Sequence, residues 1–503
     1  MPRYIKLADP DNVLLAIDAL APGEEVGGVS VAQRVPRGHK MSVQPIAKDA
    51  AVVKYGEIIG FAKEDIAPGN WVHEQNVYIR SFDRDYEFGV AAKPTYYAPA
   101  AERKTFQGYK RANGRYGTRN YVAIMTSVNC SASAARFIAE QINRSSILED
   151  YPNIDGVISL VHGSGCGLDL HGEDYELLRR TQWGYATNPN IGGVLMVGLG
   201  CESFQIPRWM QSYGVTESES FRSLIIQEVG GTRKTVEAGV KAICEMLPTV
   251  NHASRTDAPA SELMLALQCG GSDGYSGITA NPALGVAVDL LVAQGGTAVL
   301  SETPEIYGAE HLLIRRAETS AIGERLAERI RWWEDYTKRN NMEMNNNPSP
   351  GNKAGGLTTI LEKSLGASVK GGSTNLAGVF GYAEPVTARG LVFMDTPGYD
   401  PVSATGQVAG GANMMCFTTG RGSAFGCKPT PSIKLATNSF IYESMNEDMD
   451  INCGDVLDGV SLTSKGEEIF GRILAVASGE RTKSEILGYG DSEFVPWSVG
   501  ATT

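Results

Sequence analysis

The sequence predicts an α/β protein with a small all-β module at its N-terminus, and three observations support this fold class. Residues 1–88 alternate short β-like runs, such as NVLLAI and VSVAQRV, with turns and show little helical periodicity. From residue 107 onward, apolar strands alternate with longer amphipathic segments, which is the pattern of parallel α/β architecture. With 503 residues the chain is too long for a single core, so several domains are expected.

Four segments follow from this pattern. The all-β module covers residues 1–88, and a linker covers 89–106, where prolines and alanines occur without a clear period. A central α/β domain covers 107–250, with strands such as NYVAIMTSV, DGVISLV and GGVLMVGLG. The turn-forming run PTVNHASRTDAPAS then separates it from a second α/β domain at 260–503.

Composition narrows the function classes. Hydrophobic content of 42% with 20% charged residues is typical of a soluble globular protein. The net charge of −12 argues against nucleic acid as a partner. No apolar run reaches the roughly 18 residues needed to cross a bilayer, and MPRYIKLADP lacks a signal-peptide core. We therefore expect a cytoplasmic protein with no nucleic-acid or membrane partner.

Four cysteines stand at the ends of predicted strands. Cys130 ends NYVAIMTSVNC, Cys166 ends GVISLVHGSGC and Cys201 ends GGVLMVGLGC, at spacings of 36 and 35 residues that each match one βαβ unit. Cys269 closes LMLALQC 68 residues further on, near two such units. Because the carboxyl ends of parallel strands lie on one edge of a sheet, we expect these thiols to converge.

Convergent thiolates bind soft or borderline metals, namely iron–sulfur clusters, Fe(II) or zinc. The chain has no CxxC pair, which argues against a structural zinc site. Three thiolates with an open coordination position would suit an iron that acts as a Lewis acid on a hydroxyl or carboxylate. The alternative is that a cysteine is only a small core residue, which is the role we expect for Cys244, Cys416 and Cys453.

The stretch QCGGSDGYSGITANPALG, residues 268–285, follows the strand that Cys269 ends. Its glycines and small polar residues allow two interpretations, a tight turn or a binding loop. If the loop binds, its glycines let the backbone approach a ligand, and four side chains are candidates to contact metal or substrate hydroxyls: Ser272, Asp273, Thr279 and Asn281.

Two histidines are candidates for proton transfer, because an unperturbed imidazole has a pKa of about 6.5. His162 lies in VHGSGCG, four residues before Cys166, and its alternative role is a hydrogen-bonded loop histidine. His39 lies in VPRGHKM beside Lys40, within the all-β module, and its alternative is a surface histidine. If His39 takes part, the module must fold over the cleft as a lid.

Three further loops carry charged candidates. Lys353, next to Asn352 in NPSPGNKAGG, has glycines nearby that leave room to enter a pocket and meet an anion. Arg421 in FTTGRGSAFG has a planar fork that binds a carboxylate at two points. Glu302 in SETPEIYGAE is a candidate metal ligand or acid/base. The alternatives are a solvated loop lysine for Lys353 and a helix N-cap for Glu302. GLGCE lacks the Rossmann dinucleotide fingerprint, so NAD is not inferred.

Together these stretches resemble the altronate/galactarate dehydratase family of sugar-acid hydro-lyases along nearly the whole chain. The matching runs are YIKLADPDNV, VPRGHK, GYKRANGRYGTRN, VGLGCE, CGGSDGYSGITANPALG, SETPEIYGAEHLL, NPSPGNKAGGLTTILEKSLG and FTTGRGSAFG. The resemblance implies an N-terminal β-clip module of the SAF type, a central domain used in dimerisation and a C-terminal Rossmann-like domain with a parallel sheet. It also implies a homodimer and a metal cofactor, which is iron as Fe2+ or as an iron–sulfur cluster, or else Mn2+.

The resemblance further implies the reaction, which is dehydration of an aldonate such as D-altronate to a 2-keto-3-deoxy acid. The C2 proton is removed and the C3 hydroxyl is lost. ETPEIYGAEHLL and NKAGGLTTILEKSLG resemble the altronate enzymes more than the galactarate enzymes, whereas HGSGCG departs from them. Galactarate dehydration and a sulfolactate sulfo-lyase-like elimination are the alternatives, and an iron–sulfur electron carrier is an alternative of another class.

This interpretation assigns a role to each candidate. Metal would bind at Cys130, Cys166, Cys201 and Cys269. The catalytic candidates are His39, His162, Lys353 and Glu302, with the acid and the base left open. The substrate-binding candidates are Lys40, Ser272, Asp273, Thr279, Asn281, Asn352 and Arg421.

Overall fold

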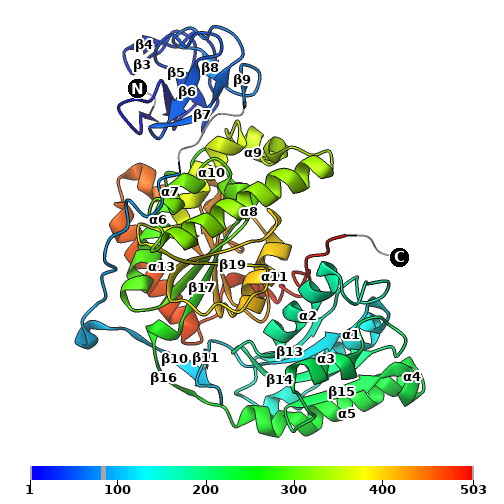
Figure 1. Ribbon diagram of the computed structural model, residues 1–503. Helices are drawn as coiled ribbons and strands as arrows, with labels where there is room; N and C mark the ends of the chain where they lie inside the picture. The colour runs from blue at the N-terminus through cyan, green and yellow to red at the C-terminus, as the bar shows by residue number, and fades with distance from the viewer. Residues whose placement is uncertain (1–2, 81–85, 501–503) are drawn as a thin grey trace.

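The computed structural model describes residues 3–80 and 86–500; residues 1 and 503, the outer limits of the predicted segments, lie outside these ranges. Figure 1 shows three bodies in a row, with the N-terminal module at one end, the C-terminal domain in the middle and the central domain at the other end. The module therefore sits on the C-terminal domain, although the central domain follows it in sequence. Residues 86–104 connect the two ends by running along the C-terminal domain, where Ala98 N bonds Ala293 O at 2.8 Å.

The N-terminal module, residues 3–80, contains only β-strands and turns, which confirms the predicted all-β class. One antiparallel sheet has the order β1 (Tyr4–Ile5), β2 (Val13–Ala16), β5 (Lys40–Ser42) and β8 (Trp71–Val72). A second contains β6 (Ala51–Lys54), β7 (Glu57–Ala62) and β9 (Val77–Tyr78), and β3 (Glu25–Val26) pairs with β4 (Val29–Ser30). Buried aliphatic side chains such as Val52 and Ile59 fill its small core.

The central domain is a four-stranded parallel sheet covered on both faces. Its strands are β12 (Tyr121–Thr126), β13 (Gly156–Leu160), β14 (Ile191–Gly198) and β15 (Phe221–Ile225), in the order β13-β12-β14-β15. Alternation along β12 serves two cores, because Ile124 packs with α1 (Ala132–Asn143) and α5 (Thr232–Asn251), whereas Met125 packs with α2 (Glu173–Ala186) and α3 (Ile206–Tyr213).

A small antiparallel sheet joins the central domain to the rest. β10 (Thr105–Lys110) pairs with both β11 (Tyr116–Gly117) and β16 (Arg255–Pro259). The strand that precedes the central domain thus pairs with the strand that follows it. This sheet brings the chain back to where it left the C-terminal domain.

The C-terminal domain is built on a seven-stranded parallel sheet in the order β19-β20-β18-β17-β21-β22-β23. The six strands from β20 to β23 follow the 3-2-1-4-5-6 order of a doubly wound Rossmann sheet, which confirms the Rossmann-like prediction. The strands are β17 (Met264–Cys269), β18 (Thr297–Leu300), β19 (Leu376–Phe380), β20 (Gly390–Met394), β21 (Met414–Thr419), β22 (Ser432–Ala436) and β23 (Ile451–Asn452).

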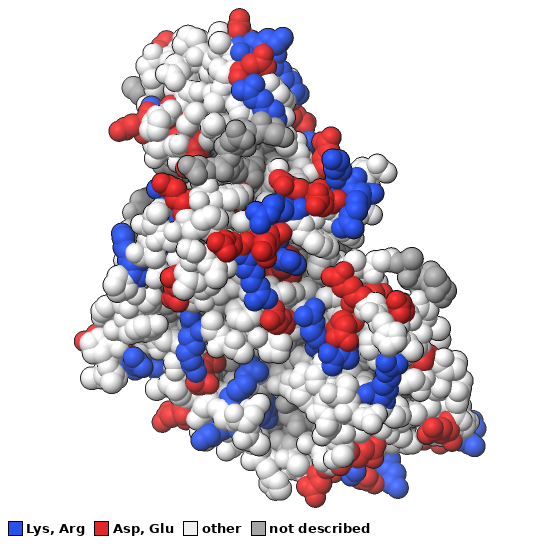
Figure 2. Space-filling view, in the orientation of Figure 1, with Lys and Arg blue, Asp and Glu red and all other residues white. Residues whose placement is uncertain are grey.

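Helices cover both faces of this sheet. One face carries α6 (Ala280–Ala293), α8 (Ser320–Arg339) and α13 (Leu462–Ala477), and the other carries α11 (Asp400–Gly410), which shares a core with α2 of the central domain. The shorter helices of this domain are α7 (Glu310–Ile314), α9 (Pro350–Ala354), α10 (Ile360–Ser368), α12 (Ser439–Ser444) and α14 (Lys483–Leu487). The short helix α4 (Ile226–Val229) belongs to the central domain. No helix within the described ranges is long and apolar enough to span a membrane. Basic and acidic side chains alternate over the face in Figure 2.

Candidate active site

The carboxyl ends of β17 and β21 meet at the point where the strand order of the C-terminal sheet reverses. Ligands of doubly wound proteins bind at this position, outside the strand ends. Cys269 is the last residue of β17, and Gly270 and Gly271 follow it. On the neighbouring strand Thr419 ends β21, and Gly420 and Arg421 follow. The site is therefore built first from these two strand ends.

Glu302 is the most unusual residue at this edge. It caps the 3-10 turn η5 (Thr303–Ile306) with φ 68°, a left-handed conformation that non-glycine residues rarely adopt. Its carboxyl is buried, and neither oxygen has a hydrogen-bond partner among the described residues. Burial and the nearby Glu305 and Asp400 raise the pKa of Glu302 well above its usual value. A strained, unpartnered buried carboxyl is a mark of a functional site.

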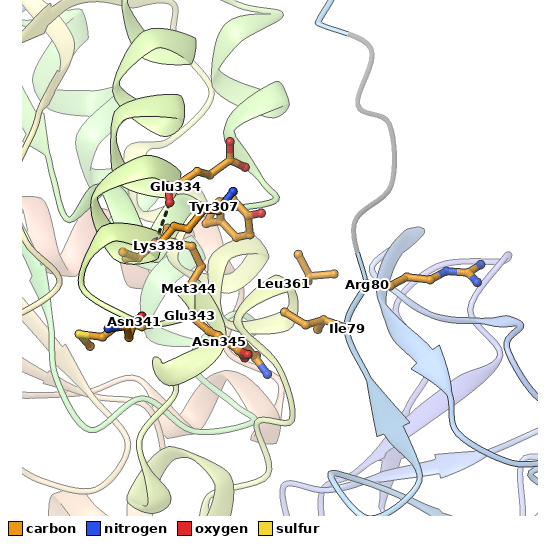
Figure 3. A pocket seen from close by; sticks show the side chains of 12 residues that line it. Ile79, Arg80, Tyr307, Glu334, Lys338, Asn341, Glu343, Met344, Asn345 and Leu361 are labelled. Atoms are coloured by element: carbon orange, nitrogen blue, oxygen red, sulfur yellow. Dashed lines mark hydrogen bonds between the residues drawn. The ribbon is translucent and has the colours of Figure 1, made fainter.

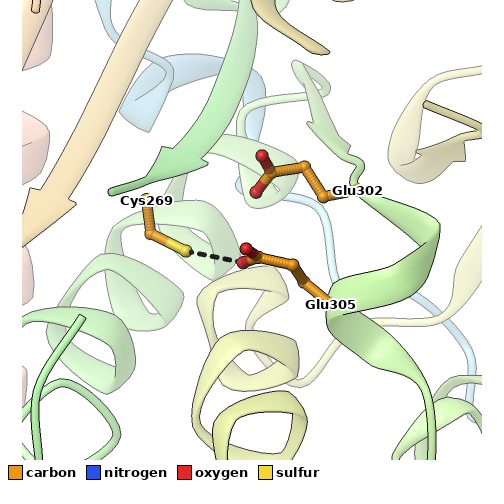
Figure 4. A group of neighbouring side chains, drawn as sticks. All are labelled: Cys269, Glu302 and Glu305. Carbon is orange, nitrogen blue, oxygen red and sulfur yellow. Dashed lines mark hydrogen bonds between the residues drawn. The ribbon is translucent and has the colours of Figure 1, made fainter. Parts of the chain in front are cut away.

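Cys269 and Glu305 lie against Glu302 (Figure 4). The Cys269 thiol donates to Glu305 Oε2 at 3.3 Å and accepts from Lys370 Nζ at 2.7 Å. Burial raises the pKa of this thiol to about 12, against the opposing effect of the Lys370 ammonium. The thiol is therefore in its neutral form, with both its proton and its lone pair engaged.

Glu305 is the charged member of the group. Lys363 Nζ donates to its Oε1 at 2.6 Å, and Asn347 Nδ2 donates to the same oxygen at 2.9 Å. Burial alone would raise the pKa of Glu305, but Lys363 and Lys370 outweigh it and lower the pKa to about 2. Asp400 lies beside Gly270, and burial together with Glu305 raises its pKa to about 7.

The donor set of this group suits a divalent metal. One ligand atom from each of Cys269, Glu302 and Glu305 lies within 4.8 Å of the others. If the Cys269 thiol gives up its proton on metal binding, a thiolate with two carboxylates matches borderline ions such as Fe2+ and harder ions such as Mn2+. The unpartnered oxygens of Glu302 are free to become ligands, so the residues fit the cofactor that the sequence led us to expect.

The N-terminal module covers this edge. Lys40 Nζ and Lys54 Nζ each lie 2.8 Å from a different oxygen of Glu362, and all three side chains are fully buried. Burial lowers the pKa of Lys40 to about 8. Lys40 also donates to Gly356 O at 2.7 Å. The predicted substrate-binding residue Lys40 thus ties the module to the C-terminal domain.

The backbones of module and domain approach each other closely at Gly38. A side chain on either Gly274 or Gly356 would clash with the Gly38 carbonyl, so these positions need glycine. Gly274 belongs to the loop after Cys269. The glycines of this loop therefore admit the backbone of the module.

His39 faces the same interface. Its Nδ1 accepts from Trp71 Nε1 at 3.1 Å, and its Nε2 lies 3.4 Å from Ala354 O. Its ring lies edge-on to that of His73, with centroids 4.9 Å apart, and His73 Nδ1 lies 3.1 Å from Thr358 Oγ1. Burial and then Lys40 lower the pKa of both histidines to about 4. The module does lie over the edge, as the lid role of His39 requires.

Asp273 shapes the loop after Cys269. Its carboxylate accepts hydrogen bonds from Ser276 Oγ, Thr437 Oγ1, Asn438 Nδ2 and the Tyr275 amide, at 3.0–3.1 Å. Burial is the largest influence on this carboxyl and raises its pKa. This predicted substrate-binding residue thus links the ends of two strand loops.

The other predicted residues of this loop are also internal. Thr279 Oγ1 donates to Thr437 O at 2.7 Å, and Asn281 Nδ2 donates to Gly366 O at 2.8 Å. Ser272 is buried, and its carbonyl accepts from Asn352 Nδ2 at 2.9 Å. Asn281 Oδ1 has no partner among the described residues. Asn281 therefore has an acceptor left to offer a ligand.

The two predicted anion-binding cations differ. Lys353 Nζ lies 2.8 Å from Glu74 Oε2 of the module, so it already has a counter-ion. Arg421 is exposed beside Gly271, at the switch point of the sheet. Arg37 of the module is also exposed and lies over the rings of Tyr275 and Phe440, at 5.9 and 5.7 Å. The mouth of the site is therefore basic.

Cys130, Cys166 and Cys201 lie elsewhere. They follow β12, β13 and β14 of the central sheet and are exposed, whereas Cys269 is buried in the C-terminal domain. The structure thus divides the predicted four-cysteine set into three and one. His162 belongs to the central edge, where its Nε2 donates to Thr126 O at 2.8 Å and its Nδ1 accepts from Ser164 N at 3.2 Å.

A separate pocket of about 720 Å³ opens between the module and α8 (Figure 3). Ile79 and Arg80 line one side, and Tyr307 and Leu361 line part of the other. None of the lining residues belongs to the Cys269 group. We do not include this pocket in the site.

Sequence reasoning missed four members of the buried group, namely Glu305, Lys363, Lys370 and Asp400. One signal was present, since Glu305 stands three residues after Glu302 in SETPE. Lys363 and Lys370 are seven residues apart, two turns of a helix, in a segment that begins as α10. The sequence also did not single out His73, which is buried beside His39.

Three family models match the chain. They are D-galactarate/altronate dehydratase, C-terminal, over residues 260–502; D-galactarate dehydratase/altronate hydrolase, second domain, over 108–251; and altronate/galactarate dehydratase SAF domain, over 2–80.

Individual relatives align over most of their length. The chain is 38% identical over 489 residues to galactarate dehydratase (L-threo-forming) of Escherichia coli K12, covering 95% of this chain and 93% of the relative. It is 36% identical over 490 residues to altronate dehydratase of the same organism, covering 96% and 97%. It is 33% identical to (2R)-sulfolactate sulfo-lyase subunit beta of Chromohalobacter salexigens, covering 78% of this chain and 97% of that subunit.

Proposed function

This chain belongs to the altronate/galactarate dehydratase family, and on that premise we propose that it dehydrates a sugar acid to a 2-keto-3-deoxy acid. The first substrate to test is an aldonate such as D-altronate. Galactarate is the second. The chain is 38% identical to the galactarate enzyme and 36% identical to the altronate enzyme, so identity alone does not separate the two substrates. Elimination from sulfolactate is the third, given the sulfo-lyase relative.

The observation that carries the location of this chemistry is the unpartnered Glu302 carboxyl beside Cys269 and Glu305. It lies at the switch point of the Rossmann sheet, under the N-terminal module. Dehydration needs one group to remove the C2 proton and another to assist departure of the C3 hydroxide. A buried carboxyl without a hydrogen-bond partner is free to assist these steps, either by moving a proton itself or as a ligand of the metal proposed below.

Neighbouring residues of this chain supply the charge that the reaction needs. Negative charge builds on the substrate carboxylate as the C2 proton leaves, and fixed cations stabilise it. Lys363 and Lys370 are buried next to the group, and Arg421 stands at its mouth. His39 and Lys40 are buried where the module docks on the domain, against Ala354, Gly356 and Glu362.

We also propose the metal. Fe2+ or Mn2+ would be held by Cys269, Glu302 and Glu305, which fit it by donor type and spacing. It would supply Lewis acidity for the leaving hydroxyl. The family resemblance supports, in addition, a cytoplasmic homodimer that associates through the central domain.

An anaerobic assay with added Fe2+ or Mn2+ tests the proposal. D-altronate, galactarate and sulfolactate are supplied separately, and keto-acid and sulfite formation are measured. We expect keto acid from one of the two sugar acids and no turnover without metal. An electron carrier would instead show a reversible redox titration and no product from any of the three, which would refute the dehydratase assignment.

A further inference from the structure

The three cysteines at the carboxyl edge of the central sheet are not used by the proposed site. Cys130, Cys166 and Cys201 are free and exposed. They follow three adjacent parallel strands, β13, β12 and β14, so the topology brings them to one edge. Exposed thiols are unusual, because free cysteine is among the most buried residue types. Three of them at one sheet edge call for a chemical explanation.

The loops that carry these cysteines are bonded to one another. Asn129 N, next to Cys130, donates to Ser164 O at 3.0 Å, two residues before Cys166. Phe204 N, in the Cys201 loop, donates to Gly165 O at 3.0 Å. Gly165 has φ 105°, and a side chain on it would run into the backbone of residues 127 and 128. The backbone at Gly165 is therefore held against both neighbouring loops.

Two polar side chains near the thiols, those of Glu202 and His162, already have hydrogen-bond partners within the edge. Glu202, next to Cys201, is buried and accepts hydrogen bonds from Ser127 Oγ, Leu199 N and Gly200 N at 2.5–3.1 Å. His162 has both ring nitrogens engaged within the edge. Neither side chain is therefore available as a ligand. They fix the loops, and the thiols are the groups that these loops present.

The edge opens into a cavity of about 470 Å³ lined by Cys166, Asn129 and Arg136, and by Phe494 and Pro496 of the C-terminal tail. Phe494 is buried and packs edge-on to His162, with ring centroids 6.2 Å apart. The cavity thus has a basic wall, an apolar wall and a thiol. It has room for a group larger than one ion.

We propose that Cys130, Cys166 and Cys201 bind an iron–sulfur cluster that is distinct from the site at Cys269. The sulfur ligands of one tetrahedral ion at 2.3 Å would be about 3.8 Å apart. Within the described ranges these three do not form a group with all ligand atoms inside 4.8 Å, so as they stand they do not form a site for a single tetrahedral ion. Cysteine thiolates are the usual ligands of such clusters.

Three thiolates leave one iron of a four-iron cluster without a protein ligand. Arg136 lines the cavity that Cys166 also lines, so a small oxyanion such as a carboxylate would suit the open position. The positive charge of Arg136 would favour both the anionic cluster and this ligand. The proposal does not depend on the dehydratase assignment, because it concerns another edge of the molecule.

Anaerobic reconstitution of the full chain with Fe2+ and sulfide tests the proposal. Iron and acid-labile sulfide are measured per chain, together with visible absorbance and the EPR spectrum of the reduced protein. The variants are Cys166→Ser and Cys201→Ser. The matched controls are Cys244→Ser, a half-buried cysteine of α5, and Cys269→Ser. Thermal unfolding confirms that each variant is folded.

We expect wild type and both controls to hold the same amount of acid-labile sulfide with the iron of a cluster, and Cys269→Ser to lose at most the single iron of its own site. The two edge variants should lose the sulfide, the cluster iron and the cluster absorbance, and keep at most the single iron bound at Cys269. Iron without sulfide in the wild type, or unchanged sulfide in both edge variants, would overturn the proposal. Turnover is assayed separately, so failure of the cluster proposal leaves the keto-acid result standing, and the reverse also holds.

Discussion

The carboxyl edges of the two parallel sheets differ in which side chains are exposed and which are hydrogen-bonded. At the central edge the thiols are exposed, and the nearby carboxylate Glu202 has every hydrogen bond it needs. At the C-terminal edge the thiol of Cys269 is buried, and the carboxyl of Glu302 has no hydrogen-bond partner in the described part of the chain. Position at a strand end places a group on a binding edge. Its neighbours then decide its protonation state and availability.

The covers of the two edges differ as well. A folded module with buried charges covers the C-terminal edge, through Lys40, Lys54 and Glu362. Beside the central edge there is only the C-terminal tail, in which Phe494 packs on His162 of that edge. Further along the tail, Trp497 stacks on Trp333 of α8, with ring centroids 5.6 Å apart. The first cover is fixed by buried ion pairs. The second leaves a cavity open next to thiols. The two edges are therefore suited to different chemistry.

The largest expected effect separates the two buried glutamates. Glu302→Gln should lower kcat by about 10²–10⁴-fold, the range for loss of an acid or base group. Its unfolding midpoint should stay near wild type, because neither carboxyl oxygen has a partner to lose. Glu202→Gln should do the reverse and cost about 1–3 kcal/mol of stability, because an amide cannot accept all three hydrogen bonds.

Steady-state kinetics and urea unfolding of both variants make this comparison. If Glu202→Gln, measured where it is fully folded, lost as much turnover as Glu302→Gln, the active site would not be confined to the C-terminal edge.

The next effect tests the cover of the C-terminal edge. Glu362→Gln leaves Lys40 and Lys54 buried without a counter-ion, which costs about 3–5 kcal/mol for a buried pair. Glu74→Gln in the same interface removes a partly exposed pair with Lys353 and should cost about 0–1 kcal/mol. Urea unfolding measures both. Equal small losses would mean that the buried charges do not hold the module.

The sequence supported the fold far better than the site. Period-two and strand–helix patterns predicted the module, both sheets and the edges at which Cys130 and Cys269 would lie. The predicted domain boundary already put Cys269 in another domain than the other three cysteines, but the shared local pattern of the four strand ends led us to expect that all of them converge. Convergence depends on strand order, which local sequence does not encode.

The burial of individual side chains was the second property that the sequence did not predict. Lys363 and Lys370 have the composition of ordinary helix-surface residues, yet both are buried with Glu305 and Cys269. Glu302 was identified from its place after a strand, but its missing hydrogen bonds depend on how residues 395–403 pack around it. Contacts between distant segments decide whether a charged side chain becomes a reactive group.

A third effect is acid weakening of the module interface. The pKa values of His39 and His73 are about 4 in the folded protein and about 6.5 when unfolded. Between these values the unfolded chain binds more protons, so stability falls as the pH falls from 6.5 to 4, by up to about 1.4 kcal/mol per pH unit for each histidine. Glu362, with its pKa lowered to about 2, adds a loss between pH 4.5 and 2.

His73→Gln should remove one histidine's share of this slope between pH 6.5 and 4. The exposed His252, at the end of α5, provides the control His252→Gln, which should leave the slope unchanged. Urea unfolding at several pH values measures it. A slope that is the same in His73→Gln and wild type would show that His73 titrates alike in the folded and unfolded states.

The smallest expected effect decides which edge binds the substrate. Arg421→Gln at the C-terminal mouth should raise KM about tenfold with a smaller change in kcat, since a charge-assisted contact to a carboxylate contributes about 1.5–3 kcal/mol. Arg136→Gln, at the cavity of the central edge, is the matched exposed arginine and should leave KM unchanged. The opposite result would reverse the comparison. A raised KM in Arg136→Gln alone would place the sugar acid beside the three thiols, and the buried carboxyl at Glu302 would then need another role.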